Sequence, residues 1–299
     1  MFRRASWFTL LLAALHGLLL LGASKRPHVV VLLSQDLPPY RQTIEGFQQQ
    51  LDKLGIGCEL EILPLAAPLE RVQADLLLAL GTPATKRAGG YTGAPVVSAL
   101  ALRAADLGPR GGMTGVFLEF PVEVELQWMT RLLPGHRRVG VIYSRAENQE
   151  RMLQATRAAE ALSLQLIRRP IEGPREIPAS LASLQNEAEV LWGVADDTVL
   201  TPQTATEFLT YALRNRMPFV GLSLPWVKAG ALYALDRDYA DVGRQCGEMA
   251  ARILRGEPVA AVPREAPRRV VYSVNLRTAE QLALSIPGSL LRGASEVIE

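Results

Sequence analysis

The sequence predicts an α/β protein of two similar lobes, each built around a parallel sheet. Short apolar runs alternate with segments of helical periodicity, which is the pattern of buried parallel strands and their covering helices. The order of strands and helices starts again near residue 138, so the chain contains the unit twice. With 299 residues, of which 48% are hydrophobic and 21% charged, the chain is long enough to give each lobe its own core.

The first repeat is expected between residues 28 and 118. Apolar residues recur at spacings of three and four from Ile44 to Leu54, which predicts a helix ended by Gly55. Thr82-Pro83 marks the start of another helix, since Thr is a good N-cap and Pro suits the first helical position. Apolar and β-branched runs predict strands at His28–Leu33, Cys58–Leu63, Leu76–Leu80, Pro95–Ser98 and Met113–Leu118.

The second repeat is expected between residues 138 and 284. Thr201-Pro202 stands where Thr82-Pro83 stands in the first repeat, and it also marks a helix start. Strands are predicted at Arg138–Tyr143, Leu164–Ile167, Val190–Ala195, Pro218–Leu222, Ala231–Leu235 and Val270–Val274. Helices are predicted at Asn148–Leu162, Ile177–Leu184, Pro202–Arg214, Tyr239–Leu254 and Arg277–Leu284.

Two facing Rossmann-like lobes indicate a clamshell with a ligand cleft between them. In open parallel sheets, ligands lie beyond the carboxyl ends of the strands, and the loops there carry mainly neutral polar groups with a few carboxylates. These groups suit a small zwitterion or a neutral polar ligand better than a polyphosphate. The alternative for each side chain is capping of a helix start without any contact to ligand.

The first 23 residues have the features of a secretory signal peptide. Arg3 and Arg4 precede an apolar stretch from Trp7 to Leu21, which ends in small residues up to Ala23. A membrane-spanning helix needs about 20 apolar residues, so cleavage near Ala23 is expected in preference to an uncleaved anchor. The mature chain would then be periplasmic, with no stable membrane insertion and equal numbers of basic and acidic residues.

The residue chemistry argues against a nucleic-acid partner and against an enzyme. The formal net charge is only +2, which leaves no basic excess to hold a phosphate backbone. Three histidines without paired spacing make no metal site, and no nucleophile elbow, Walker motif or dinucleotide fingerprint is present. No cofactor, metal or catalytic residue is therefore expected. Cys58 and Cys246 could pair in an oxidising compartment or remain separate buried thiols.

A series of short segments follows in a fixed order over residues 28 to 298. They are Leu80–Ala84, Met113–Val116, Leu132–Pro134, Arg137–Tyr143, Asp196–Val199, Pro218–Gly221, Gly230–Leu232, Asp238-Tyr239, Ile253–Gly256 and Val274–Leu276. In this order the segments resemble the tryptophan/tyrosine-type substrate-binding proteins of ABC transporters, which have the type I periplasmic-binding fold.

The resemblance implies a ligand held by the loops after the first, third and fourth strands of each half. Three chain crossings between the lobes are expected near Phe120, Pro225 and Pro263. The N-terminal lobe would comprise residues 24–120 plus 226–263, and the C-terminal lobe residues 121–225 plus 264–299. The ligand-binding residues carried onto this sequence are Ser34, Gln35, Gly81, Thr82, Ser98, Tyr143, Asn148, Asp196, Asp197, Thr198 and Ser223.

Three positions depart from the family pattern, all in the expected pocket. The chain has Ala99–Leu102 where the family usually has an Asp-Pro-Val-like stretch, Gln149 where Ser is common, and Leu222-Ser223 where Ser-Asp is frequent. The expected function is a periplasmic solute-binding protein. It would close on a small polar, amino-acid-like ligand, aromatic amino acids among the candidates, and deliver it to an ABC permease with a cytoplasmic ATPase. The alternative is a ligand-binding periplasmic sensor or adaptor without a permease.

Overall fold

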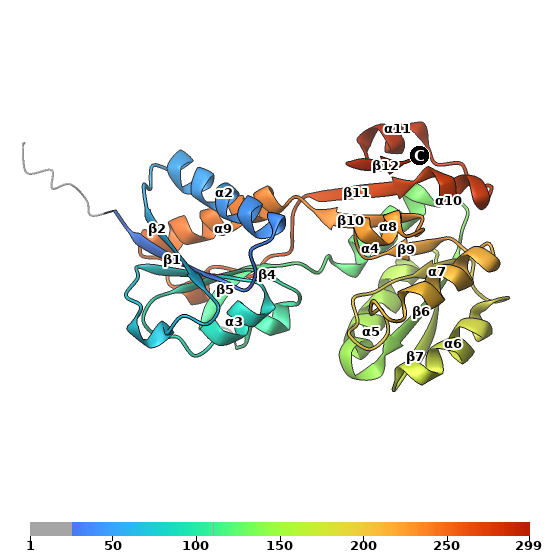
Figure 1. The fold of residues 1–299 in the computed structure, drawn as a ribbon, viewed down its shortest axis with the longest axis horizontal. Coiled ribbons are helices and arrows are strands. Elements are labelled where there is room, and N and C mark those ends of the chain that lie inside the picture. The colour runs from blue at the N-terminus through green and yellow to red at the C-terminus, as the bar shows by residue number, and fades with distance from the viewer. Residues whose placement is uncertain (1–25, 110) are drawn as a thin grey trace, which may run out of the picture.

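The computed structural model describes residues 26–109 and 111–299, which form two α/β lobes joined by extended segments (Figure 1). One lobe contains a five-stranded sheet of order β2-β1-β3-β4-β5, and the other a seven-stranded sheet of order β12-β11-β10-β9-β8-β6-β7. The signal peptide expected over residues 1–23 lies outside the described residues. Within the described part of the chain, no helix combines the length and the apolar character needed to cross a membrane.

The five-stranded sheet is wholly parallel, and its strands other than β2 are mostly buried on both faces, whereas β2 at one edge is partly exposed. One face packs against α2 and α9, and the other against α3. Burial on both faces explains why the inner strands β1 and β3 are continuous apolar runs. The strands are β1 His28–Leu33, β2 Glu59–Pro64, β3 Leu76–Leu80, β4 Val96–Ala101 and β5 Met113–Phe117, and the helices are α2 Pro38–Lys53, α3 Thr82–Ala88 and α9 Tyr239–Leu254, with short 3₁₀ turns at Leu69–Arg71, Ala104–Leu107 and Val259–Ala261.

The seven-stranded sheet is parallel except where β11 runs antiparallel to β10. Its strands are β6 Arg138–Ser144, β7 Gln165–Ile171, β8 Val190–Trp192, β9 Phe219–Gly221, β10 Tyr233–Arg237, β11 Val270–Asn275 and β12 Glu296–Ile298. Its helices are α4 Val122–Leu132, α5 Arg145–Ala161, α6 Ile177–Leu184, α7 Ala205–Arg214, α8 Leu224–Lys228, α10 Leu276–Gln281 and α11 Gly288–Gly293, with a 3₁₀ turn at Pro174–Glu176.

The chain changes lobes at positions that differ in part from those expected. The first passage follows β5, close to the expected Phe120. The expectation of a crossing near Pro225 is wrong, because α8 packs against β9 and β10, and β10 joins the seven-stranded sheet. The chain returns to the first lobe between Arg237 and Tyr239, where α9 begins. Glu265 still pairs with Val116 of β5, so the last passage lies between this residue and β11.

The two Thr-Pro pairs, each predicted to start a helix, have different outcomes in the structure. Helix α3 does begin at Thr82, although Gly81 and not Thr82 occupies the N-cap position. The expected start at Thr201-Pro202 is wrong, because α7 begins at Ala205. The hydroxyl of Thr204 donates to the Val199 carbonyl at 2.6 Å and closes a turn that delays the helix.

The helices α2 and α9, far apart in sequence, pack side by side on the first lobe (Figure 1). Glycines allow this close approach. A Cβ at Gly46 would overlap the Ala240 carbonyl oxygen, and one at Gly243 would overlap the Thr43 carbonyl oxygen. Because both obstacles are backbone atoms, they cannot be relieved by a change of rotamer. Cys246 lies buried on the same helix, and both Cys58 and Cys246 are free thiols.

We expect Gly243→Ala to lower the free energy of unfolding by about 1–3 kcal/mol or more, since the added methyl group forces the two helix backbones apart. Chemical denaturation followed by circular dichroism measures the change. Gly173→Ala is the matched control, because a Cβ there meets no atom within 4 Å. Equal stability of the two variants would contradict the close packing of α2 and α9.

Candidate functional site

The carboxylate of Asp196 organises the loop that follows β8. One oxygen accepts the backbone N–H of Ser144 at 2.7 Å and the Nδ2 of Asn148 at 2.8 Å. The other accepts the N–H groups of Thr198 and Val199, both at 3.0 Å. The side chain is buried, so these four bonds replace its hydration. Asp196 therefore holds together the ends of β6 and β8, which is the capping role that the sequence left open.

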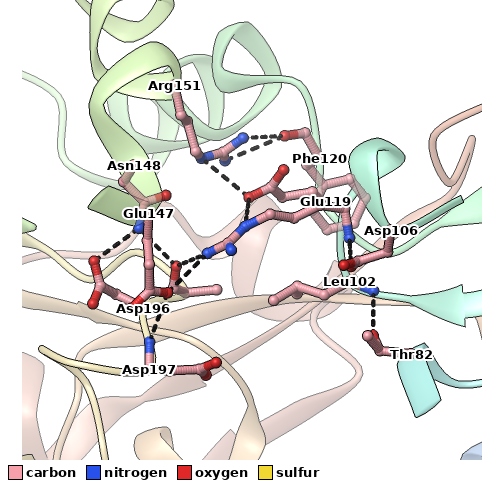
Figure 2. Close-up of polar contacts among 12 residues, drawn as sticks. Thr82, Leu102, Asp106, Glu119, Phe120, Glu147, Asn148, Arg151, Asp196 and Asp197 are labelled. Carbon is pink, nitrogen blue, oxygen red and sulfur yellow. Dashed lines mark hydrogen bonds and ion pairs between the residues drawn. The ribbon is translucent and has the colours of Figure 1, made fainter. Parts of the chain in front are cut away.

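Glu147 lies above this loop on the first turn of α5 (Figure 2). Its carboxylate accepts the N–H of Asp197 and the hydroxyl of Thr198, both at 3.0 Å, and an N–H of Arg103 at 3.3 Å. Burial acts to raise the pKa of Glu147, but these hydrogen bonds outweigh it and lower the pKa below its usual value. Glu147 is therefore a fixed anion at neutral pH.

Arg103 reaches this anion from the other lobe. It stands just after β4, and its guanidinium donates to the Ala195 carbonyl at 3.1 Å as well as to Glu147. Its Nε lies 3.6 Å from an oxygen of Glu119, is buried, and has no hydrogen-bond partner among the described residues. A single side chain thus links the loop after β4 to the first turn of α5 and to the loop after β8.

A second arginine, Arg151 of α5, holds the first connection between the lobes. It donates twice to the Phe120 carbonyl, at 3.2 and 3.3 Å, and once to Glu125 at 3.0 Å. It also lies 3.7 Å from Glu119, which it shares with Arg103 (Figure 2). Burial raises the pKa of Glu125, and the Arg151 charge opposes that rise.

The returning connection is fixed to the same place by Arg237, at the end of β10. Its Nε donates to the Leu118 carbonyl at 2.7 Å, and its guanidinium lies 4.8 Å from the centre of the Phe120 ring. The two connections are therefore bound to each other next to the cleft. The acidic and basic groups here pair with one another, so the cluster carries no large unbalanced charge.

A cavity of about 220 Å³ opens beside this cluster, at the carboxyl ends of β8 and β9. Trp192, Val220, Leu235 and Phe120 give it apolar walls. Tyr233 is also part of the lining, and its buried hydroxyl has no hydrogen-bond partner in the described part of the chain. The rest of the lining is Leu102, Glu119, Glu125, Arg151, Gly193, Val194, Ala195, Gly221, Leu222 and Arg237.

The structure brings the predicted residues of the first lobe together at one edge of its sheet. Ser34 accepts the N–H of Ala84 at 2.9 Å, and Thr82 accepts that of Leu102 at 3.0 Å. Gly81 has φ +91°, and a Cβ there would lie 2.7 Å from the Ser34 hydroxyl oxygen. These three residues shape the loops after β1 and β3, and both hydroxyl oxygens already accept a backbone hydrogen bond.

Two predicted residues point into the protein interior. Ser98 is fully buried, and its hydroxyl lies 2.6 Å from that of Thr85. Tyr143 is also buried, and its hydroxyl donates to Gln149 at 3.1 Å. Neither side chain lines the cavity. A continuous apolar strand gives no sign of which face meets the cleft, which is why sequence reasoning included them.

Three predicted residues keep polar side chains available. Asp197 and Gln35 are exposed and Ser223 is half-buried, and the structure gives no hydrogen bond to their side chains from residues 26–109 and 111–299. Asn148 differs, because its amide nitrogen is bonded to Ala195 and Asp196 while its buried Oδ1 has no partner in the described chain.

Sequence reasoning missed the charged residues that dominate the site. Arg103, Glu119, Glu147, Arg151 and Arg237 lie far apart along the chain. Two of them could have been identified from their positions in the sequence. Glu147 immediately precedes the predicted Asn148, and Arg103 follows the fourth predicted strand. Among the described residues, no three His, Cys, Asp or Glu side chains are placed to hold a metal ion.

Most of the chain is similar to a known protein family and to a curated relative. Residues 65–298 match the family described as ABC transporter substrate binding protein. A curated tyrosine-binding protein of Clostridioides difficile strain R20291 is 23% identical over 199 residues, which are 63% of this chain. The match spans 57% of that relative's length.

Solved structures share the fold over most of the chain. The ligand-free, open structure of a substrate-binding protein with adhesive properties from Clostridium difficile has a TM-score of 0.72 at 20% identity, covering 91% of this chain and 99% of that one. An ABC domain in complex with L-Trp from Streptococcus pneumonia has a TM-score of 0.62 at 21% identity, covering 91% and 100%. A periplasmic ribose ABC transporter protein from Conexibacter woesei has a TM-score of 0.53 at 14% identity, covering 90% and 98%.

These structures confirm the two-lobed α/β fold, and the family match confirms the resemblance found in the sequence. The matched segment covers both lobes apart from β1, α2 and β2 of the first lobe. The family comprises solute-binding proteins and not enzymes. The chain therefore belongs to the family of ABC transporter substrate-binding proteins.

Proposed function

We propose that this chain is the periplasmic receptor of an ABC importer and that it binds an amino-acid-like ligand between its lobes. The observation that carries this proposal is the meeting of both lobes at one polar cluster, where Arg103 reaches Ala195 and Glu147 across the cleft. Relatives named for tyrosine and solved with L-Trp support an amino acid as the ligand class. Export by the N-terminal leader and delivery to a permease belong to the same proposal.

The available polar groups suit an α-amino acid. The exposed Asp197 carboxylate has no hydrogen bond from the described chain and would hold the ligand ammonium group. The neighbouring Asp196 has all its acceptor capacity taken by backbone and amide donors, so it would fix the loop and leave recognition to Asp197. Gln35, on the other lobe, would contact the ligand once the cleft closes.

Ligand binding itself is tested by thermal denaturation of the purified protein with single amino acids, sugars and nucleosides. We expect amino acids alone to raise the melting temperature, because a ligand at 100 times its Kd stabilises the folded state by about 2.7 kcal/mol. Stabilisation by sugars only would exclude the amino-acid class. If no compound acts on a folded sample, solute binding itself fails. Co-purification with a permease and ATPase pair would separate an importer subunit from a sensor or adaptor.

The adjacent aspartates provide a matched pair of variants. We expect Asp197→Asn to lower ligand affinity at least about tenfold, since it removes the charge opposite the ammonium, while leaving the ligand-free melting temperature unchanged. Asp196→Asn should instead destabilise the protein by about 1–3 kcal/mol, because the amide NH₂ would face two N–H donors. Calorimetry gives the affinity and thermal denaturation the stability. The opposite assignment of the two effects would refute these roles.

The Arg103 link should restrict how far the lobes separate. We expect Arg103→Ala to increase the radius of gyration of the ligand-free protein in small-angle X-ray scattering and to cost about 1–3 kcal/mol of stability. Arg145→Ala is the control, because its ion pair with Glu172 at 3.0 Å is exposed and lies within one lobe. That variant should lose less than about 1 kcal/mol and keep its scattering profile. Unchanged scattering from Arg103→Ala would show that the link does not restrain the lobes.

A further inference from the structure

The guanidinium group of Arg264 is enclosed by the backbone of a single loop. Arg264 lies just before the last connection between the lobes, because the next residue, Glu265, still pairs with Val116 of β5. Its nitrogens donate hydrogen bonds of 2.8 to 3.4 Å to five backbone carbonyls, which belong to Ala104, Leu107, Gly108, Pro109 and Met113. One side chain therefore gathers the loop between β4 and β5 around a cation.

The shape of this loop matches a guanidinium group. The last carbonyls of a helical turn have no partner within the turn, and arginine side chains can satisfy them. Here the 3₁₀ turn Ala104–Leu107 is followed by Gly108, whose φ of +66° is a left-handed conformation that glycine favours. The chain turns back there, so carbonyls before and after Gly108 bond the same group. Lysine cannot reproduce this pattern, because its donors lie on one nitrogen and not on a planar fork.

The turn that Arg264 holds also fixes the backbone of Arg103. Arg103 is the residue that caps the start of the turn, and its N–H donates to the carboxylate of Asp106 at 2.9 Å (Figure 2). Its carbonyl accepts the N–H of Asp106 at 3.0 Å. The guanidinium of Arg103 in turn bonds Glu147 and the Ala195 carbonyl of the other lobe. A continuous set of contacts thus leads from Arg264 through the turn to the second lobe.

The residue before Arg103 is held by a different set of contacts. The N–H of Leu102 donates to the hydroxyl of Thr82 at 3.0 Å, and the Leu102 carbonyl accepts the N–H of Glu119 at 3.0 Å. Arg264 bonds neither of these groups. Any effect of Arg264 on Arg103 must therefore pass through the turn that follows it, which makes the effect separable by experiment.

We propose that Arg264 is a positioning residue for the link between the lobes. It holds the Ala104–Leu107 turn in the shape that directs the Arg103 guanidinium to Glu147 and to the Ala195 carbonyl. Arg264 itself touches no residue of the second lobe in these contacts, so it acts on the lobes only through Arg103. The inference goes beyond the proposed function, because it concerns how far the lobes separate and does not depend on which ligand binds.

The test is a double-mutant cycle read by small-angle X-ray scattering of the purified protein without ligand. We expect Arg264→Lys to increase the radius of gyration by about half or more of the increase that Arg103→Ala causes. The double variant should match Arg103→Ala alone, because the link through which Arg264 acts is then already lost. Arg87→Lys is the control, since Arg87 donates to the Ala67 carbonyl of another loop in the same lobe at 2.6 Å. That variant should keep the wild-type profile.

Hydrogen exchange resolved by residue separates positioning from general loss of stability. In Arg264→Lys, the amide of Arg103, which is bonded to Asp106, should exchange about tenfold faster or more, while the amide of Leu102, which is bonded to Thr82, should keep its rate. Asp106→Ala loosens the same turn without altering Arg264 and should enlarge the protein in the same way. It replaces Arg264→Lys in the cycle if that variant does not fold.

Three results would overturn the role of Arg264. They are wild-type scattering from Arg264→Lys, an increase in the double variant that adds to that of Arg103→Ala, and equal acceleration of the Leu102 and Arg103 amides. The role also fails if Arg103→Ala leaves the scattering unchanged, since no link then remains for Arg264 to position. None of these results affects amino-acid binding, which the thermal denaturation experiment tests separately.

Discussion

A chain of contacts that begins at the buried carboxylate of Asp196 determines how the two lobes meet. Four donors hold Asp196 in place, and they set the path of the loop after β8. That path presents the N–H of Asp197 to Glu147 and the carbonyl of Ala195 to Arg103. The link between the lobes thus depends on a carboxylate that never touches the second lobe.

The charged cluster beside the cleft has a different physical character. Its arginines and glutamates are partly withdrawn from water, so desolvation offsets much of the attraction between them, whereas removal of a single partner costs stability because it leaves the other charge unpaired. Their directional bonds to the carbonyls of Leu118 and Phe120 instead fix the two connections against each other.

The inner strands of the first lobe could be predicted from sequence because both faces of the sheet are covered there, which makes these strands continuous apolar runs. His28–Leu33 and Leu76–Leu80 coincide with β1 and β3. The crossing expected near Pro225 was wrong because a proline after a strand is consistent with either a change of lobe or a short helix, and here it starts α8. The same limit applies to Ser98 and Tyr143, whose strands are apolar on both sides and so conceal the direction of each side chain.

The sequence by itself determined the fold class and the family resemblance, because apolar periodicity and short ordered segments are local properties of a chain. Only the tertiary structure decided which polar groups remain available. Asp196 and Asp197 are adjacent and have the same side chain. The carboxylate of Asp196 accepts four hydrogen bonds, whereas that of Asp197 is exposed. Arg103, Arg151 and Arg237 converge from distant parts of the chain, and the unpaired hydroxyl of Tyr233 exists only because folding buries it against a cavity. Burial and pairing are properties of the packed molecule, so no spacing along the sequence records them.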